Sequence, residues 1–196
     1  METSKKTGHG LPGSVIPCLT GNMVYALIRL GYLQDERVKG AIDWLIKYQK
    51  ADDGGESTSD QRYLKNVACF GRHTCFMGVV KALKAFSAIP AKQRSQEVNE
   101  KVKELSEFML VHHLYRKSHN LETIAKVGWT RFGFPLMYQT DLLEILEIFR
   151  DLGINDVRMQ DAYEVVKSRR QDDGTWKLQN TFNGKMIVDI ERKNEP

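Results

Sequence analysis

The sequence predicts an all-α protein built from repeated helical hairpins. Several segments place apolar residues three and four positions apart, which is the spacing of amphipathic helices. Short turns that contain glycine or proline separate these segments, and few β-branched runs favour strands. A helix, a link, a second helix and a polar turn recur in that order, as in helical-repeat proteins. The 196 residues, of which 41% are hydrophobic, suit a single domain over residues 1–196.

The first hairpin is expected at about residues 18–55. Its first helix presents Val24, Leu27 and Ile28 on one face. Its second helix is expected to begin after Asp35, because an aspartate carboxylate at this position accepts a backbone N–H of the first turn. The paired glycines that follow are expected to stop this helix, since glycine adopts the left-handed conformation common at helix ends.

Two further hairpins are expected at about residues 73–119 and 138–176. The earlier one has Pro90 in its turn and runs into the polar segment His112–His119, which we interpret as a solvated tail rather than a histidine metal cluster. The later one begins with an amphipathic helix that ends at Gly153. The apolar face of this helix consists of Leu142, Ile145, Leu146 and Phe149.

The first and third hairpins resemble each other in their turns. The first contains Leu30-Gly31 and later Asp52-Asp53-Gly54, and the third contains Leu152-Gly153 and later Asp172-Asp173-Gly174. The interval between the two turns is nearly the same, so we interpret the hairpins as copies of one unit. The alternative is an unrelated helical bundle, since Leu-Gly helix ends are common. The aspartate pairs are expected to accept backbone N–H groups in these turns rather than to bind Mg²⁺.

Charge and composition exclude several classes of function. The net charge is +4, and the basic residues are too dispersed for a nucleic-acid-binding surface. No apolar run reaches the roughly 18–20 residues that span a bilayer. The segment Met1–Gly10 is polar and lacks the apolar core of a secretion signal. Three cysteines, an odd number, do not suggest a disulfide framework, so we expect a cytoplasmic protein with reduced thiols.

One turn resembles a motif of a known superfamily. The turn Gln171-Asp-Asp-Gly-Thr-Trp176 is similar to the Q-x-x-G-x-W core of the repeats of squalene cyclases, and to turns in protein prenyltransferase β subunits. Three wider segments resemble a group of uncharacterised bacterial and archaeal proteins described as prenyltransferase-like or squalene-cyclase-like. These segments are Cys18–Met23, Arg72–Cys75 and Arg131–Asp141.

The resemblance implies an α/α toroid, in which inner helices run in parallel around a central cavity, or part of a toroid. The sequence departs from this pattern in two ways. The acidic D-x-D-D initiator of the cyclases is absent, and the predicted hairpins make only about half of a complete ring. We therefore expect a partial toroid, a piece of a longer one, or half of a ring formed by a homodimer.

The cysteines are the strongest candidates for a functional site. Cys69, His73 and Cys75 lie within seven residues, and thiolate and imidazole are ligands that zinc prefers. The parallel inner helices of a toroid would bring Cys18 to the same rim, where helix N-termini favour the thiolate form. We therefore predict a zinc ion bound by Cys18, Cys69, His73 and Cys75. The alternative is that the cysteines are small core residues and that His73 caps a helix.

Asp141 and Arg131 are the predicted catalytic residues. In a toroid Asp141 would lie across the cavity mouth from His73, as a metal ligand or a general base. Arg131 lies among aromatic residues that suit an isoprenoid or a cationic intermediate, and its guanidinium would hold a diphosphate. The alternative is that Thr140 caps a helix, that Asp141 serves its first turn and that the aromatic residues form core. These aromatic residues are Trp129, Phe132, Phe134 and Tyr138.

Together, the pattern and the resemblance predict a terpenoid cyclase-like or prenyltransferase-like protein. Its central cavity would take an apolar or isoprenoid ligand, and a reaction, if there is one, would be zinc-assisted thiol alkylation or a lyase step. The alternative is a non-catalytic module that holds a protein or lipid partner on a concave helical surface. Neither reading involves nucleic acid or a membrane span.

Overall fold

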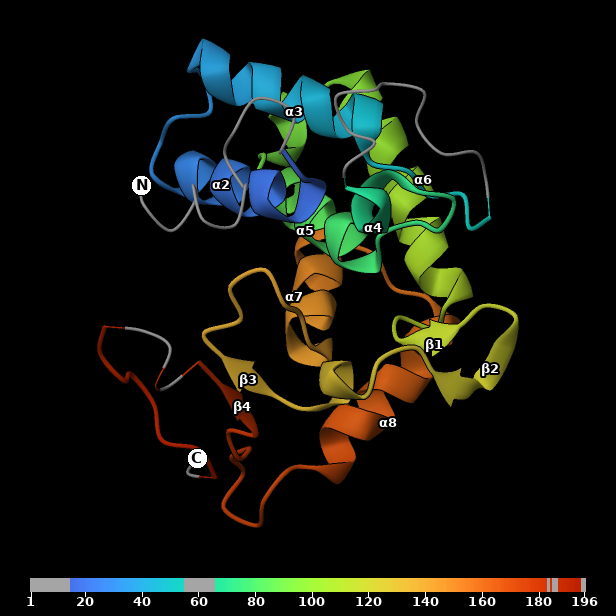
Figure 1. Ribbon diagram of the computed structural model, residues 1–196, viewed down its shortest axis with the longest axis vertical. Helices are drawn as coiled ribbons and strands as arrows, with labels where there is room; N and C mark the ends of the chain where they lie inside the picture. Colours follow the sequence, from blue (N-terminus) through green and yellow to red (C-terminus); the bar gives the residue numbers. More distant parts are fainter. Residues whose placement is uncertain (1–14, 55–65, 183, 185–186, 195–196) are drawn as a thin grey trace. The chain divides into compact units, whose positions relative to one another are not determined.

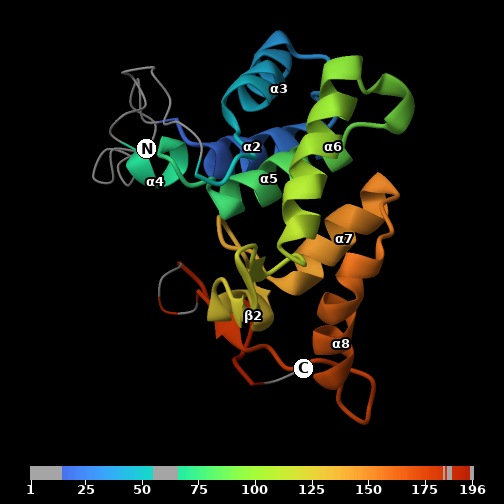
Figure 2. The same cartoon turned by 90° about the vertical axis from the view of Figure 1, so that its right-hand side faces the viewer.

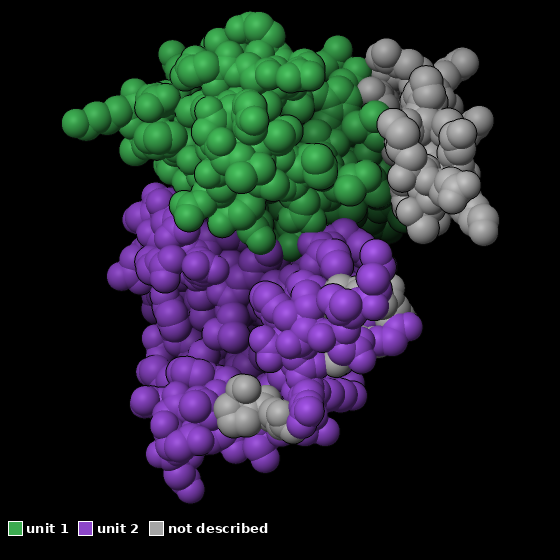
Figure 3. Space-filling model, turned by 90° about the vertical axis from the view of Figure 1, so that its left-hand side faces the viewer, with its two compact units in different colours: residues 1–108 green, residues 109–196 purple. Residues whose placement is uncertain are grey.

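The computed structural model describes residues 15–54, 66–182, 184 and 187–194. The chain divides into two compact units, residues 1–108 and 109–196, which are green and purple in Figure 3. Two predictions lie outside the described residues. They are the absence of a secretion signal in Met1–Gly10 and the end of the first hairpin at Gly55.

The prediction of an all-α fold is wrong. The described residues form seven α-helices and two small sheets with four strands, and about 53% of the chain is helical. The segment His112–His119, expected as a solvated tail, instead has buried residues and contains the first strand of a β-hairpin. Two short strands at residues 133–134 and 180–181 also pair with each other. Because a toroid consists of helices alone, this mixed fold is not the predicted α/α toroid.

Unit 1 is helical in its described residues (Figure 1). Its helices agree closely with those predicted from the apolar periodicity. Asp35 is the N-cap of the second of them, as predicted, because its carboxylate accepts the backbone N–H of Arg37 at 2.8 Å. The elements are α2 (Pro17–Arg29), α3 (Glu36–Tyr48), α4 (Val67–Phe70), α5 (Phe76–Ser87), the 3₁₀ turn η1 (Ala91–Gln93) and α6 (Gln96–Val111), whose last residues belong to unit 2.

The centre of unit 1 is a close helix pair, α2 and α5, which lie side by side in Figures 1 and 2. Gly21 of α2 permits this approach, because a Cβ there would collide with the backbone of Lys81 in α5. Gly78 of α5 makes room for the side chain of Gln49, the C-cap of α3, with which an added Cβ would collide. Apolar side chains of α2, α3 and α5 complete the core around the pair. They include Val24, Ile28, Leu45, Val79, Leu83 and Phe86.

Unit 2 combines a helical hairpin with two small sheets. Helices α7 and α8 contact each other and form the hairpin (Figure 2). The helix α7 begins at the N-cap Asp141 and ends at Gly153, whose φ of 74° is left-handed, as predicted for this glycine. The elements are β1 (Arg116–Lys117), β2 (Asn120–Ile124), the 3₁₀ turn η2 (Val127–Thr130), β3 (Gly133–Phe134), α7 (Leu142–Leu152), the 3₁₀ turn η3 (Val157–Met159), α8 (Gln160–Ser168) and β4 (Asn180–Thr181).

The sheets of unit 2 differ in their topology. β1 and β2 form an antiparallel hairpin, in which Lys117 pairs with Asn120. β3 and β4 are parallel although many residues separate them, and Gly133 pairs with Asn180. The chain reaches β4 through the turn that resembles the Q-x-x-G-x-W motif, where the Trp176 indole N–H donates to the Val166 carbonyl oxygen at 2.8 Å. This bond attaches the turn to the end of α8 and so directs the following segment toward β3.

Candidate functional site

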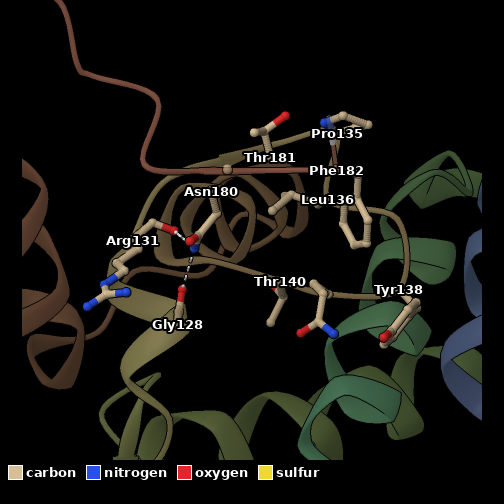
Figure 4. A pocket seen from close by; sticks show the side chains of 11 residues that line it. Gly128, Arg131, Pro135, Leu136, Tyr138, Thr140, Asn180, Thr181 and Phe182 are labelled. Atoms are coloured by element: carbon tan, nitrogen blue, oxygen red, sulfur yellow. Dashed lines mark hydrogen bonds between the residues drawn. The ribbon is translucent and has the colours of Figure 1, made fainter. Parts of the chain in front are cut away.

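A pocket of about 310 Å³ lies in unit 2 beside the parallel strand pair β3–β4. Figure 4 shows Leu136 and Phe182 on one side of it, facing Thr140 and Tyr138, with Arg131 at the far edge beside Asn180. None of the lining residues that the structure describes is acidic. The lining residues are Gly128, Arg131, Gly133, Pro135, Leu136, Tyr138, Gln139, Thr140, Asn180, Thr181 and Phe182.

The walls of the pocket are tied together by side-chain amides from the C-terminal segment. The Asn180 amide nitrogen donates to the carbonyl oxygens of Gly128 at 3.4 Å and Arg131 at 3.1 Å. The Gln179 amide oxygen accepts the Phe132 backbone N–H at 3.2 Å and also the Arg169 guanidinium at 2.8 Å. Side-chain hydrogen bonds therefore join residues 179–180 to residues 128–132, in addition to the pairing of β3 with β4.

Asp141 supports the pocket from behind and does not line it. Its two carboxylate oxygens accept the backbone N–H groups of Glu144 at 3.1 Å and Gly133 at 2.9 Å, so it caps α7 and fixes the start of β3. The side chain is almost fully buried, and this burial raises its pKa to about 6, although the two hydrogen bonds act in the opposite direction. The N-cap is thus Asp141 itself and not Thr140, and the predicted catalytic role has no accessible carboxylate to support it.

The charged groups at the pocket are cationic. Arg131 is exposed at the edge, and its guanidinium makes no hydrogen bond or ion pair within the part of the chain that the structure describes. Lys126 donates to the amide oxygen of the lining residue Gln139 at 3.0 Å. A guanidinium that has no partner among the described residues and lies beside apolar side chains suits a ligand with an anionic end.

The aromatic residues predicted around Arg131 separate into two groups. Trp129 and Phe132 are buried and belong to the core, which was the alternative interpretation of this segment. Tyr138 lines the pocket, and Phe134 is about half exposed in the strand β3. Only one of these four rings is therefore placed to contact a ligand in the pocket.

The second candidate site is a cluster of the three cysteines in unit 1. Cys18 is the second residue of α2, Cys69 lies in α4, and Cys75 is the N-cap of α5. A side-chain hydrogen bond joins Cys69 and Cys75, and Cys18 interacts electrostatically with both. The structure therefore brings together three thiols from three separate elements, and all of them are free.

The electrostatics of this cluster favour neutral thiols. Burial raises the pKa of the Cys18 thiol to about 11. The nearby Cys75 also raises this pKa, and its effect is larger than the opposite effect of the positive charge of Lys81. The hydrogen bond to Cys75 and then burial hold the pKa of Cys69 far above its usual range.

The remaining predicted zinc ligand, His73, is exposed in the turn between α4 and α5. Among the residues that the structure describes, no group of three or more histidine, cysteine, aspartate or glutamate side chains is arranged to hold a metal ion. Zinc binding stays a prediction.

Sequence reasoning missed the wall that the C-terminal segment contributes. Asn180, Thr181 and Phe182 follow a polar stretch with no alternation of apolar residues, and a strand of two residues has too few positions to show a period. The one available signal was the pair of side-chain amides at positions 179 and 180, since such groups commonly bond backbone atoms where regular structure ends.

Comparison of the chain with protein-family models, curated proteins and solved structures found no match. The resemblance to the terpenoid cyclase and prenyltransferase superfamily therefore stays a prediction. In the described residues, no helix is both long enough and apolar enough to cross a membrane.

Proposed function

We propose that unit 2 binds a small molecule that has an anionic head and a short apolar body. The observation that carries the proposal is the Arg131 guanidinium, which has no partner in the described part of the chain and lies at the edge of a pocket with apolar walls (Figure 4). Arginine binds phosphate and carboxylate groups through paired N–H donors. Pro135, Leu136 and Phe182 supply the surface that an apolar body would cover.

The size of the pocket limits the ligand. A volume of about 310 Å³ is at the lower end of the range of roughly 300–1,000 Å³ for small-molecule sites. A short-chain isoprenyl diphosphate has an anionic head and an apolar body in this size class, and the superfamily resemblance of the sequence points to the same chemistry. Longer polyprenyl chains exceed the pocket.

The proposal is one of binding rather than catalysis. Asp141, the predicted general base, is buried, and both of its oxygens already accept backbone N–H groups. A general base must reach the proton that it removes. Lining groups such as Tyr138 and Gln139 can orient a ligand by hydrogen bonding, but no lining residue is a carboxylate, histidine or cysteine among those that the structure describes.

Isothermal titration calorimetry with dimethylallyl diphosphate tests the proposal. The variant Arg131→Gln removes the charge at the pocket edge and is expected to weaken binding by about tenfold to a hundredfold, because a hydrogen bond to a charged group contributes about 1.5–3 kcal/mol. Arg150→Gln is the matched control, since Arg150 is an exposed arginine of α7 that pairs with Glu147 and Asp151. Unchanged binding by the control and weakened binding by Arg131→Gln support the proposal.

Titration with inorganic diphosphate measures the contribution of the anionic head to binding separately from that of the apolar body. It is expected to bind more weakly than dimethylallyl diphosphate, and Phe182→Ala is expected to reduce the affinity for the prenyl compound alone. Equal binding of both compounds would overturn the apolar part of the proposal. No binding of either compound to the wild-type chain would overturn the whole proposal and leave the protein-partner or lipid-partner alternative.

A further inference from the structure

A second, smaller cavity of unit 2 lies beside the end of α8, at the turn that leads to β4. Its volume is about 140 Å³, and it is lined by Phe132, Arg169, Gln171, Lys177 and Gln179. It shares no lining residue with the pocket proposed as the small-molecule site. Two of its lining residues are cationic and none is acidic, so its electrostatics favour an anion.

The guanidinium of Arg169 is held in place at this cavity. Its Nη1 donates to the Gln179 amide oxygen at 2.8 Å, and that oxygen also accepts the Phe132 backbone N–H at 3.2 Å. The guanidinium lies over the Phe132 ring, 5.8 Å from the ring centroid. Its Nε and Nη2 have no hydrogen-bond partner among the residues that the structure describes. Because the side chain is already fixed, these donors can bind an anion with little further loss of conformational freedom.

Lys177 supplies a second positive charge that the fold does not use. The side chain is exposed, and its ammonium group makes no hydrogen bond or ion pair within the described ranges of the chain. Asp173 of the same turn interacts with it electrostatically but does not line the cavity. The Asp173 Oδ1 instead accepts the Thr175 backbone N–H at 2.9 Å and the Thr175 hydroxyl at 2.7 Å. The ammonium of Lys177 is therefore available to an anion at the cavity.

We propose that this cavity binds a tetrahedral oxyanion, either free phosphate or the phosphate group of a larger molecule, between Arg169 and Lys177. The volume of about 140 Å³ is less than half of the roughly 300 Å³ at which small-molecule sites begin, so a single phosphate group suits it. The phosphate oxygens accept the remaining guanidinium N–H groups of Arg169 and the ammonium of Lys177 in charge-assisted hydrogen bonds. This site is separate from the one that contains Arg131, and it does not depend on the proposed function.

NMR of the full chain during titration with inorganic phosphate tests this proposal. Saturable shifts are expected for the Arg169 Nε–H group and for the backbone amides of Gln171 and Lys177. Sodium chloride at the same ionic strength is the control, since general screening of exposed charges does not saturate at one site. Chloride is expected to leave these three signals nearly unchanged.

Variants separate this cavity from the rest of the surface. Lys177→Gln is expected to weaken phosphate binding by about tenfold, because one charge-assisted hydrogen bond is lost. Lys177→Arg keeps the charge and is expected to retain most of the affinity. Lys167→Gln is the matched control, since Lys167 is an exposed lysine of α8 that pairs with Glu164 at 3.1 Å. Arg131→Gln is also expected to leave the affinity at this cavity unchanged, so the failure of either proposal can be distinguished from the failure of the other.

A parallel titration with glycerol 3-phosphate distinguishes the two sources of the oxyanion. Tighter binding of this compound than of inorganic phosphate would assign the site to the phosphate group of a larger molecule, and weaker binding would assign it to the free ion. Three results would overturn the proposal. They are no saturable shift of the three signals with either compound, equal shifts with chloride, and equal affinities of Lys177→Gln and the wild type.

Discussion

The two units of the molecule differ in how their candidate sites are built. The thiol cluster of unit 1 lies at the ends of three helices, and close packing of α2 on α5 fixes its surroundings. The pocket of unit 2 is lined mainly by turns and by two strands of two residues each, which side-chain amides and one carboxylate hold in place. Helix packing therefore determines one site, whereas single side-chain hydrogen bonds determine the other.

Core substitutions are expected to give the largest effects in both units. Phe86 of α5 and Phe149 of α7 are fully buried, and replacing either by alanine is expected to lower the free energy of unfolding by about 3–5 kcal/mol. Urea denaturation measures the loss. Val157→Ala is the control, because Val157 is 87% exposed and its loss is expected to change stability by less than about 0.5 kcal/mol. A small effect of either phenylalanine variant would mean that its unit lacks the core described for it.

The stability of unit 2 is expected to depend on pH through Asp141. Burial raises the pKa of Asp141 from 3.8 to about 6, so between these values the folded chain holds this proton more tightly than the unfolded chain. The corresponding stability is fully present below pH 3.8 and is lost as the pH rises through 6. The loss is about 3 kcal/mol at about 1.36 kcal/mol for each pKa unit.

The variant Asp141→Asn isolates this contribution, because its side chain stays neutral. Its free energy of unfolding, compared with that of the wild type by urea denaturation, is expected to be lower at pH 4 because the cap is weakened. This difference is expected to shrink as the pH rises to 7. Two curves that run parallel from pH 4 to 7 would show that Asp141 does not titrate in this range.

Because α2 and α5 lie close together, alanine substitutions at two glycines of unit 1 are expected to change stability in opposite directions. Gly21→Ala is expected to lower stability by about 1–3 kcal/mol, since the added Cβ would collide with the backbone of Lys81. Gly40→Ala in α3 has no neighbouring atom within 4 Å and is expected to raise stability by up to about 1 kcal/mol. Thermal denaturation of both variants measures the difference, and equal effects would contradict the close approach of α2 and α5.

The turn before β4 gives the smallest predicted effect. Trp176→Phe removes the indole N–H that donates to the Val166 carbonyl oxygen, and it is expected to lower stability by about 1 kcal/mol. The same variant is expected to weaken ligand binding slightly, because the turn directs the chain into the pocket wall. A stable variant with unchanged affinity would show that the turn does not position β4.

The sequence predicted the helices well and the strands not at all. The apolar faces of α3 and α7, the N-cap Asp35 and the left-handed Gly153 are local features, and each was found where the pattern indicated. The strands β3 and β4 are too short for a period, and their pairing depends on residues that are distant in the chain. Fold class was therefore predicted wrongly although nearly every helix was predicted correctly.

In the candidate sites, too, local features could be predicted from the sequence and contacts between distant residues could not. Cys18 and Cys75 were expected on one rim from their similar positions at two helix starts; in the structure they lie at the starts of α2 and α5 and interact electrostatically, and the shared metal site stays a prediction. Arg131 was expected at a ligand site and lines the pocket, but the other wall, with Asn180 and Phe182, could not be found from sequence. An aspartate such as Asp141 can act as a general base, and only its burial and its two hydrogen bonds show that it acts as a cap.

Backbone amide NMR of the full chain during titration with dimethylallyl diphosphate shows whether the small-molecule site belongs to unit 2. Shifts are expected for amides of the pocket wall, including Gly128, Gly133 and Asn180, and unchanged signals are expected for Cys18 and Cys75. Shifts confined to the helices of unit 1, or no shifts at saturating ligand, would contradict a site in unit 2.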